Sequence, residues 1–312
     1  MTTPDPITVQ PTVRAYAESL GEPGRRWLEA LPGAVEAWCR VWKLQRGEAL
    51  PGGSRSSVCR VTTPDGGAAV VKLALPEPIL TTQIQTLRAA AGRGYVRLLA
   101  HDLEGGALLM EALGPPPEPD DVPAALTITA GTLLRAWQVP TGGFGPAPNA
   151  EAHKAATLAV LVRDLAGAVP GAQRAVERAL GYACARLEAR DPARQVLVHG
   201  DAHLGNLLRV ERPRPGAESG YVFVDPEGFL CEPEYDLGVA LREWNVALLA
   251  AADPQAVLRA WCEQLARASG TDPEAIWQWA YLERVSTGLY LTHHGLPALG
   301  APFLSVAERL LD

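Results

Sequence analysis

A short polar segment between two apolar runs contains the residues of this chain whose types and spacing could perform chemistry. It reads HGDAHLGN over 199–206, and Asp225 follows at the end of the apolar run YVFV. γ-Phosphoryl transfer needs a group that orients or deprotonates a hydroxyl and oxygen ligands for Mg²⁺, because its loose transition state is stabilised mainly by positioning and by metal charge. The segment therefore predicts a phosphoryl-transfer site, with Asp201 as catalytic base and with Asn206 and Asp225 as Mg²⁺ ligands.

The two histidines of this segment have different expected roles. We expect His199 to brace the loop through a hydrogen bond, and His203 to be a structural or surface residue. A zinc or di-metal hydrolase is an alternative, because His199, His203, Asp201 and Asp225 are all possible metal ligands. Such sites usually draw further ligands from other loops, and the remaining histidines of the chain lie in no comparable motif. Phosphoryl transfer is therefore the preferred interpretation.

Lys72 interrupts the apolar run AVVKLAL over 69–75, where a charge is unfavourable unless it faces a partner. Only three of the 28 basic residues are lysines, so the background composition does not explain a lysine at this position. A compact ammonium suits close contact with phosphate oxygens better than a broad guanidinium. We expect Lys72 to bind nucleotide phosphates; the alternative is a strand-edge lysine that extends to solvent.

The loop 51–57 lies one strand before Lys72 and is rich in glycine and serine. Gly53 and Ser54 could offer backbone and hydroxyl donors to a phosphate. The loop has no GxxxxGK[ST] pattern, which excludes a Walker-type site. A plain hairpin loop is the alternative interpretation.

Carboxylates crowd the region that follows Asp225. They could bind guanidinium or ammonium groups through charge-assisted hydrogen bonds, and a formal net charge of −7 favours cationic small molecules over nucleic acid as partners. Glu227, Glu232 and Glu234 are the candidate substrate-binding residues, although the last two could equally lie on a solvated helix face. We expect Asp236 to support the catalytic loop or to begin a helix.

The elements that must position these residues divide the chain into two parts. With 312 residues, 47% of them apolar, the chain is a globular protein longer than one core usually supports. Helical spacing over 25–40 is interrupted at Pro32-Gly33, which predicts a broken helix or a helical hairpin. A helix is expected over 79–91. Short apolar runs, two of them joined by the hairpin signal Asp65-Gly66, predict strands at 41–44, 58–63, 68–75, 96–99 and 107–110.

Four prolines in the segment EALGPPPEPDD, 111–121, mark the boundary between the two parts. We expect a nucleotide-binding N-terminal lobe over 1–110, a hinge over 111–121, and a mainly helical C-terminal lobe over 122–312 that carries the catalytic loop and the acceptor site. Helices are expected there at 122–138, 151–167, 171–190, 235–250, 254–268, 272–292 and 300–311. The strands expected in this half are 195–198, 207–210 and 221–225.

The remaining features of the sequence concern the cellular compartment of the protein. No run approaches the roughly 18 apolar residues of a membrane span, and the N-terminus lacks the basic and apolar regions of a secretory signal. The five cysteines are scattered without a CxxC pair, in agreement with a reducing compartment. A cytoplasmic protein is expected, and a monomer is taken as the default.

The segments VLVHGDAHLGNLL and YVFVDPEGFLCEPEYDLGVALREW resemble the aminoglycoside phosphotransferase family, and most closely its streptomycin 6-phosphotransferase and hydroxyurea-resistance kinase branch. In that branch HGDxHxxN, a strand ending in DP(D/E)G and a YDL…REW helix follow in this order. GRGYVRLL over 92–99 and ALLME over 107–111 add to the resemblance. It implies an α+β, bilobal, protein-kinase-like fold with an antiparallel-sheet N-lobe and a mainly helical C-lobe.

The resemblance also implies an activity. We expect an ATP- and Mg²⁺-dependent O-phosphotransferase acting on a small-molecule hydroxyl, with a streptomycin-type aminoglycoside favoured as acceptor. Hydroxyurea or another metabolite is the alternative acceptor, and a nucleotide-binding regulatory module is the non-enzymatic alternative. Lys72 would contact the nucleotide phosphates, and the segment containing Met110, Glu111 and Leu113 would be the hinge whose backbone meets adenine.

The chain departs from the wider kinase superfamily at one place. Members usually pair the strand lysine with a glutamate on the following helix. The expected helix 79–91 offers Gln83 and Gln85 but no acidic residue. A glutamine can form a hydrogen bond with Lys72, but it provides no compensating charge.

Overall fold

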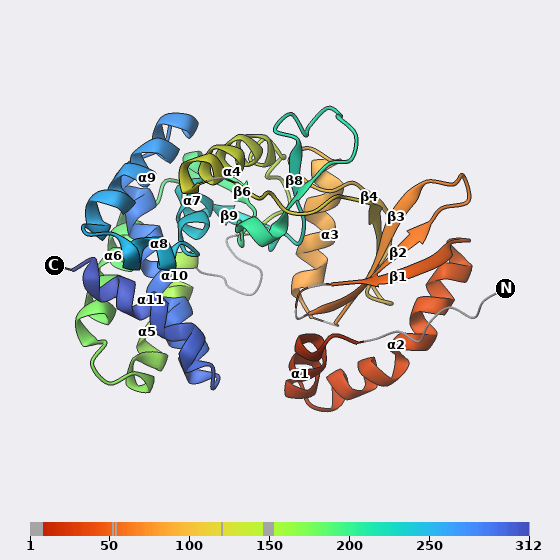
Figure 1. The fold of residues 1–312 in the computed structure, drawn as a ribbon, viewed down its shortest axis with the longest axis horizontal. Helices are drawn as coiled ribbons and strands as arrows, with labels where there is room; N and C mark the ends of the chain where they lie inside the picture. The colour runs from red at the N-terminus through yellow and green to blue at the C-terminus, as the bar shows by residue number, and fades with distance from the viewer. Residues whose placement is uncertain are drawn as a thin grey trace.

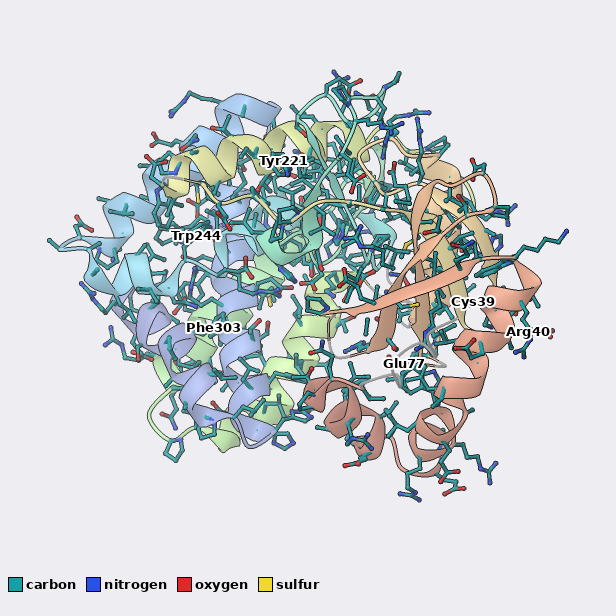
Figure 2. All side chains as sticks on the ribbon, turned by 45° about the vertical axis from the view of Figure 1, so that its right-hand side comes forward. Cys39, Arg40, Glu77, Tyr221, Trp244 and Phe303 are labelled. Carbon is teal, nitrogen blue, oxygen red and sulfur yellow. The ribbon has the colours of Figure 1, made fainter. Side chains whose placement is uncertain are left out.

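The computed structural model describes residues 9–51, 53, 55–75, 77–119, 121–145 and 153–311. Its first part is built around a sheet and its second part mainly of helices, so that the fold is α+β and bilobal (Figure 1). Figure 2 shows Cys39 and Arg40 on the sheet side of the molecule and Trp244 and Phe303 on the helical side. No helix among the described residues is long and apolar enough to span a membrane.

The N-terminal sheet has five antiparallel strands in the order β1-β2-β3-β5-β4. Lys72 lies near the middle of β3, opposite Val58 on one side and Leu108 on the other. Val71 and Leu73 pack on one face of the sheet against the long helix α2, and Lys72 therefore points to the other face, because side chains alternate along a strand. The strands are β1 (Gln45–Leu50), β2 (Ser56–Thr62), β3 (Ala68–Ala74), β4 (Leu98–Asp102) and β5 (Ala107–Glu111).

Two expectations for the first fifty residues are wrong. The helix α2 (Glu22–Val41) follows α1 (Pro11–Ser19) and runs without interruption past Pro32, which lies on the exposed face of the helix. The segment 41–44 is not a strand but the end of α2. Lys43 adopts a left-handed conformation with φ 56°, and Leu44 N donates to Cys39 O at 2.7 Å, which closes the helix.

The strand β1 begins only at residue 45 and was not expected there. Most of its side chains are exposed, because it lies at the edge of the sheet. An edge strand of this kind shows little alternation between apolar and polar residues, which is the pattern that identifies strands in a sequence.

The helix α3 (Ile79–Ala90) lies against the sheet face to which Lys72 points (Figure 1). It buries Leu80, Ile84 and Leu87 in an apolar cluster that continues into the helical part of the chain, through Leu126 and Phe223. The two parts of the molecule therefore share one continuous core next to α3.

The second part is organised around α10 (Pro273–His293), which packs against α5, α6, α7, α9 and α11. The helix expected over 235–250 is in fact two helices, because the chain turns at 242–244. The other helices of this part are α4 (Val122–Ala136), α5 (Lys154–Leu165), α6 (Gln173–Glu188), α7 (Glu234–Leu241), α8 (Asn245–Ala250), α9 (Pro254–Ser269) and α11 (Pro297–Arg309).

Two short antiparallel pairs position the polar loops of this part. The strand β6 (Val196–Val198) pairs with β9 (Phe229–Cys231), a strand that was not expected, and β7 (Leu207–Arg209) pairs with β8 (Tyr221–Phe223). The polar loop 199–206, the expected catalytic loop, joins β6 to β7, and the segment 224–228 joins β8 to β9. Because Val198 pairs with Phe229 and Leu207 with Phe223, both connections lie at the same end of these strands.

The linker between the two parts runs from Glu111, the end of β5, to Val122, the start of α4. Leu113 forms an antiparallel bridge with Val210, and Gly114 N donates to Arg209 O at 2.8 Å. The linker is therefore attached to the β7–β8 pair that carries one end of the catalytic loop.

Candidate active site

The catalytic loop is held from behind by Asp236, near the start of α7. Its carboxylate accepts hydrogen bonds from His199 N at 2.8 Å, from Gly200 N at 2.9 Å and from Trp137 Nε1 at 2.9 Å. Gly200 has a φ of +93°, and a Cβ at this position would lie 2.6 Å from Glu227 Cβ. Only glycine fits this turn, which passes close to the neighbouring segment.

His199 connects the catalytic loop to the end of β8. Its Nδ1 accepts a hydrogen bond from Asp201 N at 3.0 Å, and its Nε2 lies 2.8 Å from Val224 O. A ring that accepts at Nδ1 and donates at Nε2 is neutral. Burial lowers the pKa of His199, in agreement with this state. The imidazole therefore fixes the loop and carries no charge.

Asp201 is partly exposed and is surrounded by donors. Its Oδ1 accepts from Arg242 Nη2 at 2.7 Å, and its Oδ2 lies 3.3 Å from both His203 Nε2 and Asn206 Nδ2. Burial raises the pKa of Asp201, but the hydrogen bond from His203 and the charge of Arg242 outweigh it, and that pKa falls well below its ordinary value. Asp201 is consequently an ionised carboxylate at neutral pH, with Oδ2 directed away from the arginine.

Arg242 also belongs to this site, although it was not predicted as a site residue. It caps the C-terminal end of α7, and its Nη1 lies 3.1 Å from Glu283 Oε2 on α10. Glu283 is buried and also accepts a hydrogen bond from Tyr235 OH at 2.7 Å. The available signal was the arginine in ALREW, a cation that directly follows an apolar run.

Asn206 and Asp225 are brought together by the β7–β8 pair. Val224 N donates to Asn206 O at 2.8 Å, which places the next residue, Asp225, beside Asn206. The Asn206 amide nitrogen donates to Asp201 O at 3.0 Å, so the amide oxygen is directed away from Asp201.

This pair of side chains fits a magnesium ion. Mg²⁺ prefers oxygen ligands, and in sites that also contain substrate phosphates it needs only one or two protein side chains. Asn206 and Asp225 supply an amide oxygen and a carboxylate. In the described ranges, no group of three or more His, Cys, Asp or Glu side chains is arranged to hold a metal ion. The zinc alternative therefore finds no support in the part of the chain that is described.

Lys72 joins the sheet to the second part of the molecule. Its Nζ lies 2.6 Å from Asp225 Oδ1 and 3.4 Å from Gln83 Oε1, and Gln83 Nε2 donates to the same Asp225 oxygen at 3.1 Å. Lys72 is 6% exposed, so it does not extend to solvent from the sheet edge. The structure brings Lys72, Asn206 and Asp225 into one cluster next to Asp201.

The expected hinge residues lie between the two parts of the molecule. Met110 is buried in β5. The carboxylate of Glu111 accepts from Arg97 N at 2.8 Å and forms an ion pair with Arg214, so this side chain has protein partners. The Glu111 side chain is therefore engaged within the protein, and the expectation that the backbone of this segment meets adenine stays a prediction.

In the loop before Lys72, Gly53 is exposed, and no atom would lie within 4 Å of a Cβ placed there. Ser54 is outside the described residues. The expectation that this loop contacts phosphate stays a prediction.

Two of the three candidate substrate-binding carboxylates are internal. Glu232 is buried, accepts from Trp279 Nε1 at 2.7 Å and lies 3.4 Å from Arg186 Nη1. Glu234 is fully buried and pairs with Arg194. We therefore assign neither to the acceptor, and neither lies on a solvated face, because both side chains are buried.

Two other carboxylates are accessible beside Asp201. The Glu227 side chain is 28% exposed, and Lys154 Nζ lies 3.2 Å from its Oε2. The Glu243 side chain is 38% exposed, and it accepts from Leu204 N at 3.2 Å. Glu227 was a candidate from the sequence, whereas Glu243 was not.

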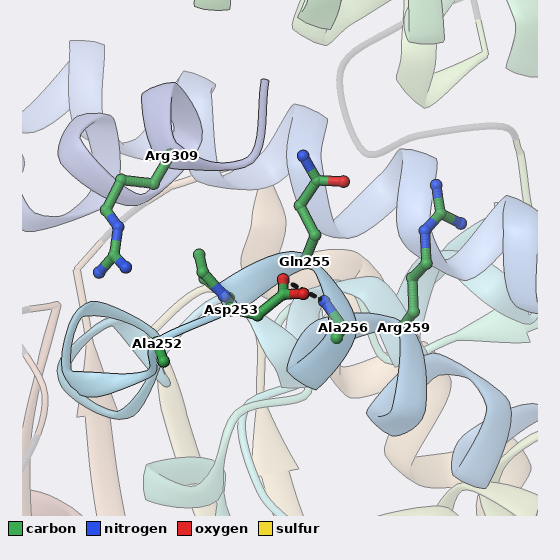
Figure 3. A pocket seen from close by; sticks show the side chains of 7 residues that line it. Ala252, Asp253, Gln255, Ala256, Arg259 and Arg309 are labelled. Carbon is green, nitrogen blue, oxygen red and sulfur yellow. Dashed lines mark hydrogen bonds between the residues drawn. The ribbon is translucent and has the colours of Figure 1, made fainter. Parts of the chain in front are cut away.

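A surface depression on the second part of the molecule shares no residue with this cluster (Figure 3). It lies where α8 leads into α9, between Arg259 and Arg309. Asp253 Oδ1 accepts from Ala256 N at 2.9 Å there, an ordinary helix N-cap. This depression therefore gives no reason to move the site away from Asp201.

The chain is similar in sequence to known proteins. The sequence pattern of the aminoglycoside/hydroxyurea antibiotic resistance kinase family matches residues 41–295. The chain is 29% identical over 306 residues to a streptomycin 6-kinase of Streptomyces glaucescens, an alignment that covers 96% of each chain. It is 33% identical over 231 residues to a hydroxyurea phosphotransferase of Kitasatospora aureofaciens, covering 71% of this chain and 64% of that protein.

A solved structure shows the same fold. The amicoumacin kinase hAmiN, in complex with AMP-PNP, Ca²⁺ and Ami, superposes with a TM-score of 0.59 at 12% identity, over 91% of this chain and 96% of that one. At this level of identity the similarity concerns the fold.

Proposed function

The chain belongs to the aminoglycoside/hydroxyurea antibiotic resistance kinase family, and from this premise we propose that it transfers the γ-phosphoryl group of ATP to a hydroxyl of a streptomycin-type aminoglycoside. The family makes the protein a small-molecule kinase. The observation that carries the choice of acceptor is the alignment with a streptomycin 6-kinase over 96% of both chains.

Asp201 would orient the acceptor hydroxyl. Its Oδ1 is engaged by Arg242, so Oδ2 is the atom that would accept the hydrogen bond from the hydroxyl. A carboxylate with a lowered pKa is a weak base, and it acts mainly by positioning the hydroxyl until the oxygen bonds to phosphorus. The proton would then pass to Oδ2, where His203 and Asn206 lie within 3.3 Å.

Lys72, Asn206 and Asp225 would hold the phosphate end of ATP. The Lys72 ammonium would contact phosphate oxygens, and the Asn206 amide oxygen and the Asp225 carboxylate would hold Mg²⁺. A bound Mg²⁺ would neutralise charge on the phosphates in the transition state. The hinge backbone around Met110, Glu111 and Leu113 would bind adenine. Residues 1–110 would thus form the nucleotide lobe, and residues 122–312 would form the acceptor lobe. The protein would act in the cytoplasm, where ATP is supplied.

Glu227 and Glu243 would bind the acceptor. Both carboxylates are partly exposed and flank the catalytic loop, one from the segment after Asp225 and the other from the turn after α7. Streptomycin carries guanidinium groups, which form strong, often bidentate hydrogen bonds with carboxylates. Glu227 lies 3.2 Å from Lys154 and Glu243 lies 3.4 Å from His203, so a cationic acceptor would join or replace these partners. Two accessible carboxylates beside Asp201 support such an acceptor over a neutral one such as hydroxyurea.

Acceptor-stimulated release of ADP tests the proposal. The purified protein is incubated with ATP, Mg²⁺ and one acceptor at a time: streptomycin, hydroxyurea, or an aminoglycoside that lacks guanidinium groups. We expect streptomycin to give the highest kcat/KM and a phosphomonoester detectable by ³¹P NMR. Nucleotide binding without turnover of any acceptor would instead support the regulatory alternative, and preference for hydroxyurea would contradict the choice of acceptor.

A further inference from the structure

Gln83 lies between the two charged residues that join the lobes. It is buried on α3, with Oε1 3.4 Å from Lys72 Nζ and Nε2 3.1 Å from Asp225 Oδ1. Lys72 Nζ lies 2.6 Å from the same Asp225 oxygen, so the three side chains form a closed set of hydrogen bonds. The helix, ILTTQIQTLRAA, contains no acidic residue.

The two neighbours determine which chemical group suits position 83. An ammonium only donates hydrogen bonds, and an ionised carboxylate only accepts them. The amide of Gln83 can accept from Lys72 and donate to Asp225 at the same time. A carboxylate here could accept from Lys72, but it would place a second negative charge against Asp225. The amide of Gln83 therefore matches both neighbours, because it accepts from one and donates to the other. The absence of charge is not the only reason that a glutamine fits this position.

The helix α3 does not depend on Gln83 to reach the loop that carries Asp225. Thr82 Oγ1 donates to Glu227 O at 2.7 Å. Gly228 approaches α3 so closely that a Cβ there would lie 2.0 Å from Thr86 Oγ1. Substitution of Gln83 should therefore change the interactions of Lys72 and Asp225 while these other attachments keep the helix in place.

We propose that Gln83 is a positioning residue for Lys72. In the free protein its amide directs the Lys72 ammonium to the Asp225 carboxylate. In the ATP complex Gln83 carries no charge of its own, so the positive charge of Lys72 is available to the phosphates. The inference rests on the proposed roles of Lys72 in phosphate binding and of Asp225 in metal binding. With no acid on α3, Lys72 has two anionic partners in turn, first Asp225 and then the nucleotide. The kinase thus dispenses with a lysine–glutamate pair within the nucleotide lobe.

The test compares Gln83→Glu with Gln85→Glu, the same change at an exposed position of the same helix. Binding of ATP is measured by calorimetry with EDTA present, and binding of Mn²⁺ is measured with no nucleotide present. Gln83→Glu should weaken the binding of metal-free ATP by at least about fivefold, which corresponds to the loss of one net hydrogen bond. It should strengthen Mn²⁺ binding, because a second carboxylate adjoins Asp225. Gln85→Glu should change neither.

Either of two results would overturn the proposal: metal-free ATP binding to Gln83→Glu that is as tight as in the wild type, or equal changes in both variants. Gln83→Leu, uncharged and similar in size, decides the matter if the glutamate variant does not fold. This variant should bind metal-free ATP more weakly than the wild type and should bind Mn²⁺ no more tightly. Unchanged affinity for ATP would again overturn the inference. Neither probe contains an acceptor, so a wrong choice of streptomycin leaves these results intact. A wild-type protein that binds neither ATP nor Mn²⁺ would instead overturn the proposed function.

Discussion

Arg242 and Asp201 form an ion pair in which the guanidinium Nη2 lies 2.7 Å from the carboxylate Oδ1. The other nitrogen of the same guanidinium lies 3.1 Å from the buried Glu283. The proposed catalytic base is therefore held by a cation that is itself fixed in the core of the second lobe. This pairing occupies Oδ1 of Asp201, so an acceptor hydroxyl would share Oδ2 with His203 and Asn206, each 3.3 Å away.

Replacement of Asp201 by asparagine tests its assignment as the base. We expect kcat to fall by about 10²- to 10⁴-fold, the usual contribution of a positioned general base. Affinity for ATP should stay close to that of the wild type, because Lys72 and Asp225 are retained. Steady-state kinetics and nucleotide calorimetry measure the two quantities. Unchanged turnover would refute the assignment.

Loss of Arg242 should destabilise the protein as well as reduce its activity. Arg242→Met leaves Glu283 as an uncompensated buried charge, which is expected to lower the free energy of unfolding by about 3 kcal/mol. The double variant Arg242→Met, Glu283→Gln should recover part of that stability, because the buried charge is gone, but not the turnover. Urea denaturation gives the stabilities. A double variant no more stable than Arg242→Met would contradict this account of the pair.

The ion pair between His203 and Asp201 predicts a dependence of stability on pH. Burial lowers the pKa of His203, but the hydrogen bond and charge of Asp201 outweigh it and raise that pKa above its ordinary value. The ion pair therefore contributes its full stabilisation when the pH is below about 6.5, the pKa of a histidine in the unfolded chain. This contribution is lost as the pH rises through the pKa of His203 in the folded protein.

We therefore expect the difference in unfolding free energy between the wild type and His203→Gln to be largest in mildly acidic buffer and to shrink as pH increases. Denaturation at a series of pH values measures it. The same comparison in an Asp201→Asn background is the control and should show a smaller pH dependence, because only Glu243 Oε1, 3.4 Å from His203 Nδ1, would then remain as an anionic partner. A difference that grows with pH would have the wrong sign for this pair.

Substitution of Glu227 should separate acceptor binding from nucleotide binding. Glu227→Gln is expected to raise KM for streptomycin by about tenfold or more, the typical effect of one hydrogen bond to a charged group, with KM for ATP little changed. Glu104→Gln, at an exposed position in the β4–β5 turn, is the matched control. If the two variants have the same KM for streptomycin, Glu227 does not contact the acceptor.

Removal of divalent cations distinguishes the proposed metal site from a zinc site. Turnover should be abolished by EDTA and restored by added Mg²⁺, because Asn206 and Asp225 provide only oxygen ligands. A chelator selective for zinc should have no effect while Mg²⁺ is present. Activity that returns with zinc but not with Mg²⁺ would contradict the assignment.

Local patterns in the sequence were reliable where one element carries its own signal. The apolar run around Lys72, the helix over 79–91 and most helices of the second part are found close to their expected positions. The failures are at α2, where an exposed Pro32 is accommodated, and at β1 and β9. These two strands have weak patterns of their own and form by pairing with partners elsewhere in the chain.

The sequence by itself determined the family, because HGDAHLGN and the DPEG…REW continuation place the proposed reacting groups within short segments whose local geometry is set by neighbouring residues. Only the tertiary structure decided which charges meet. Lys72 and Asp225 are 153 positions apart, and Arg242 and Asp201 are 41 apart. Burial showed that Glu232 and Glu234 are internal while Glu227 remains accessible. The partner of a charged side chain depends on packing between distant segments, and no local pattern records that packing.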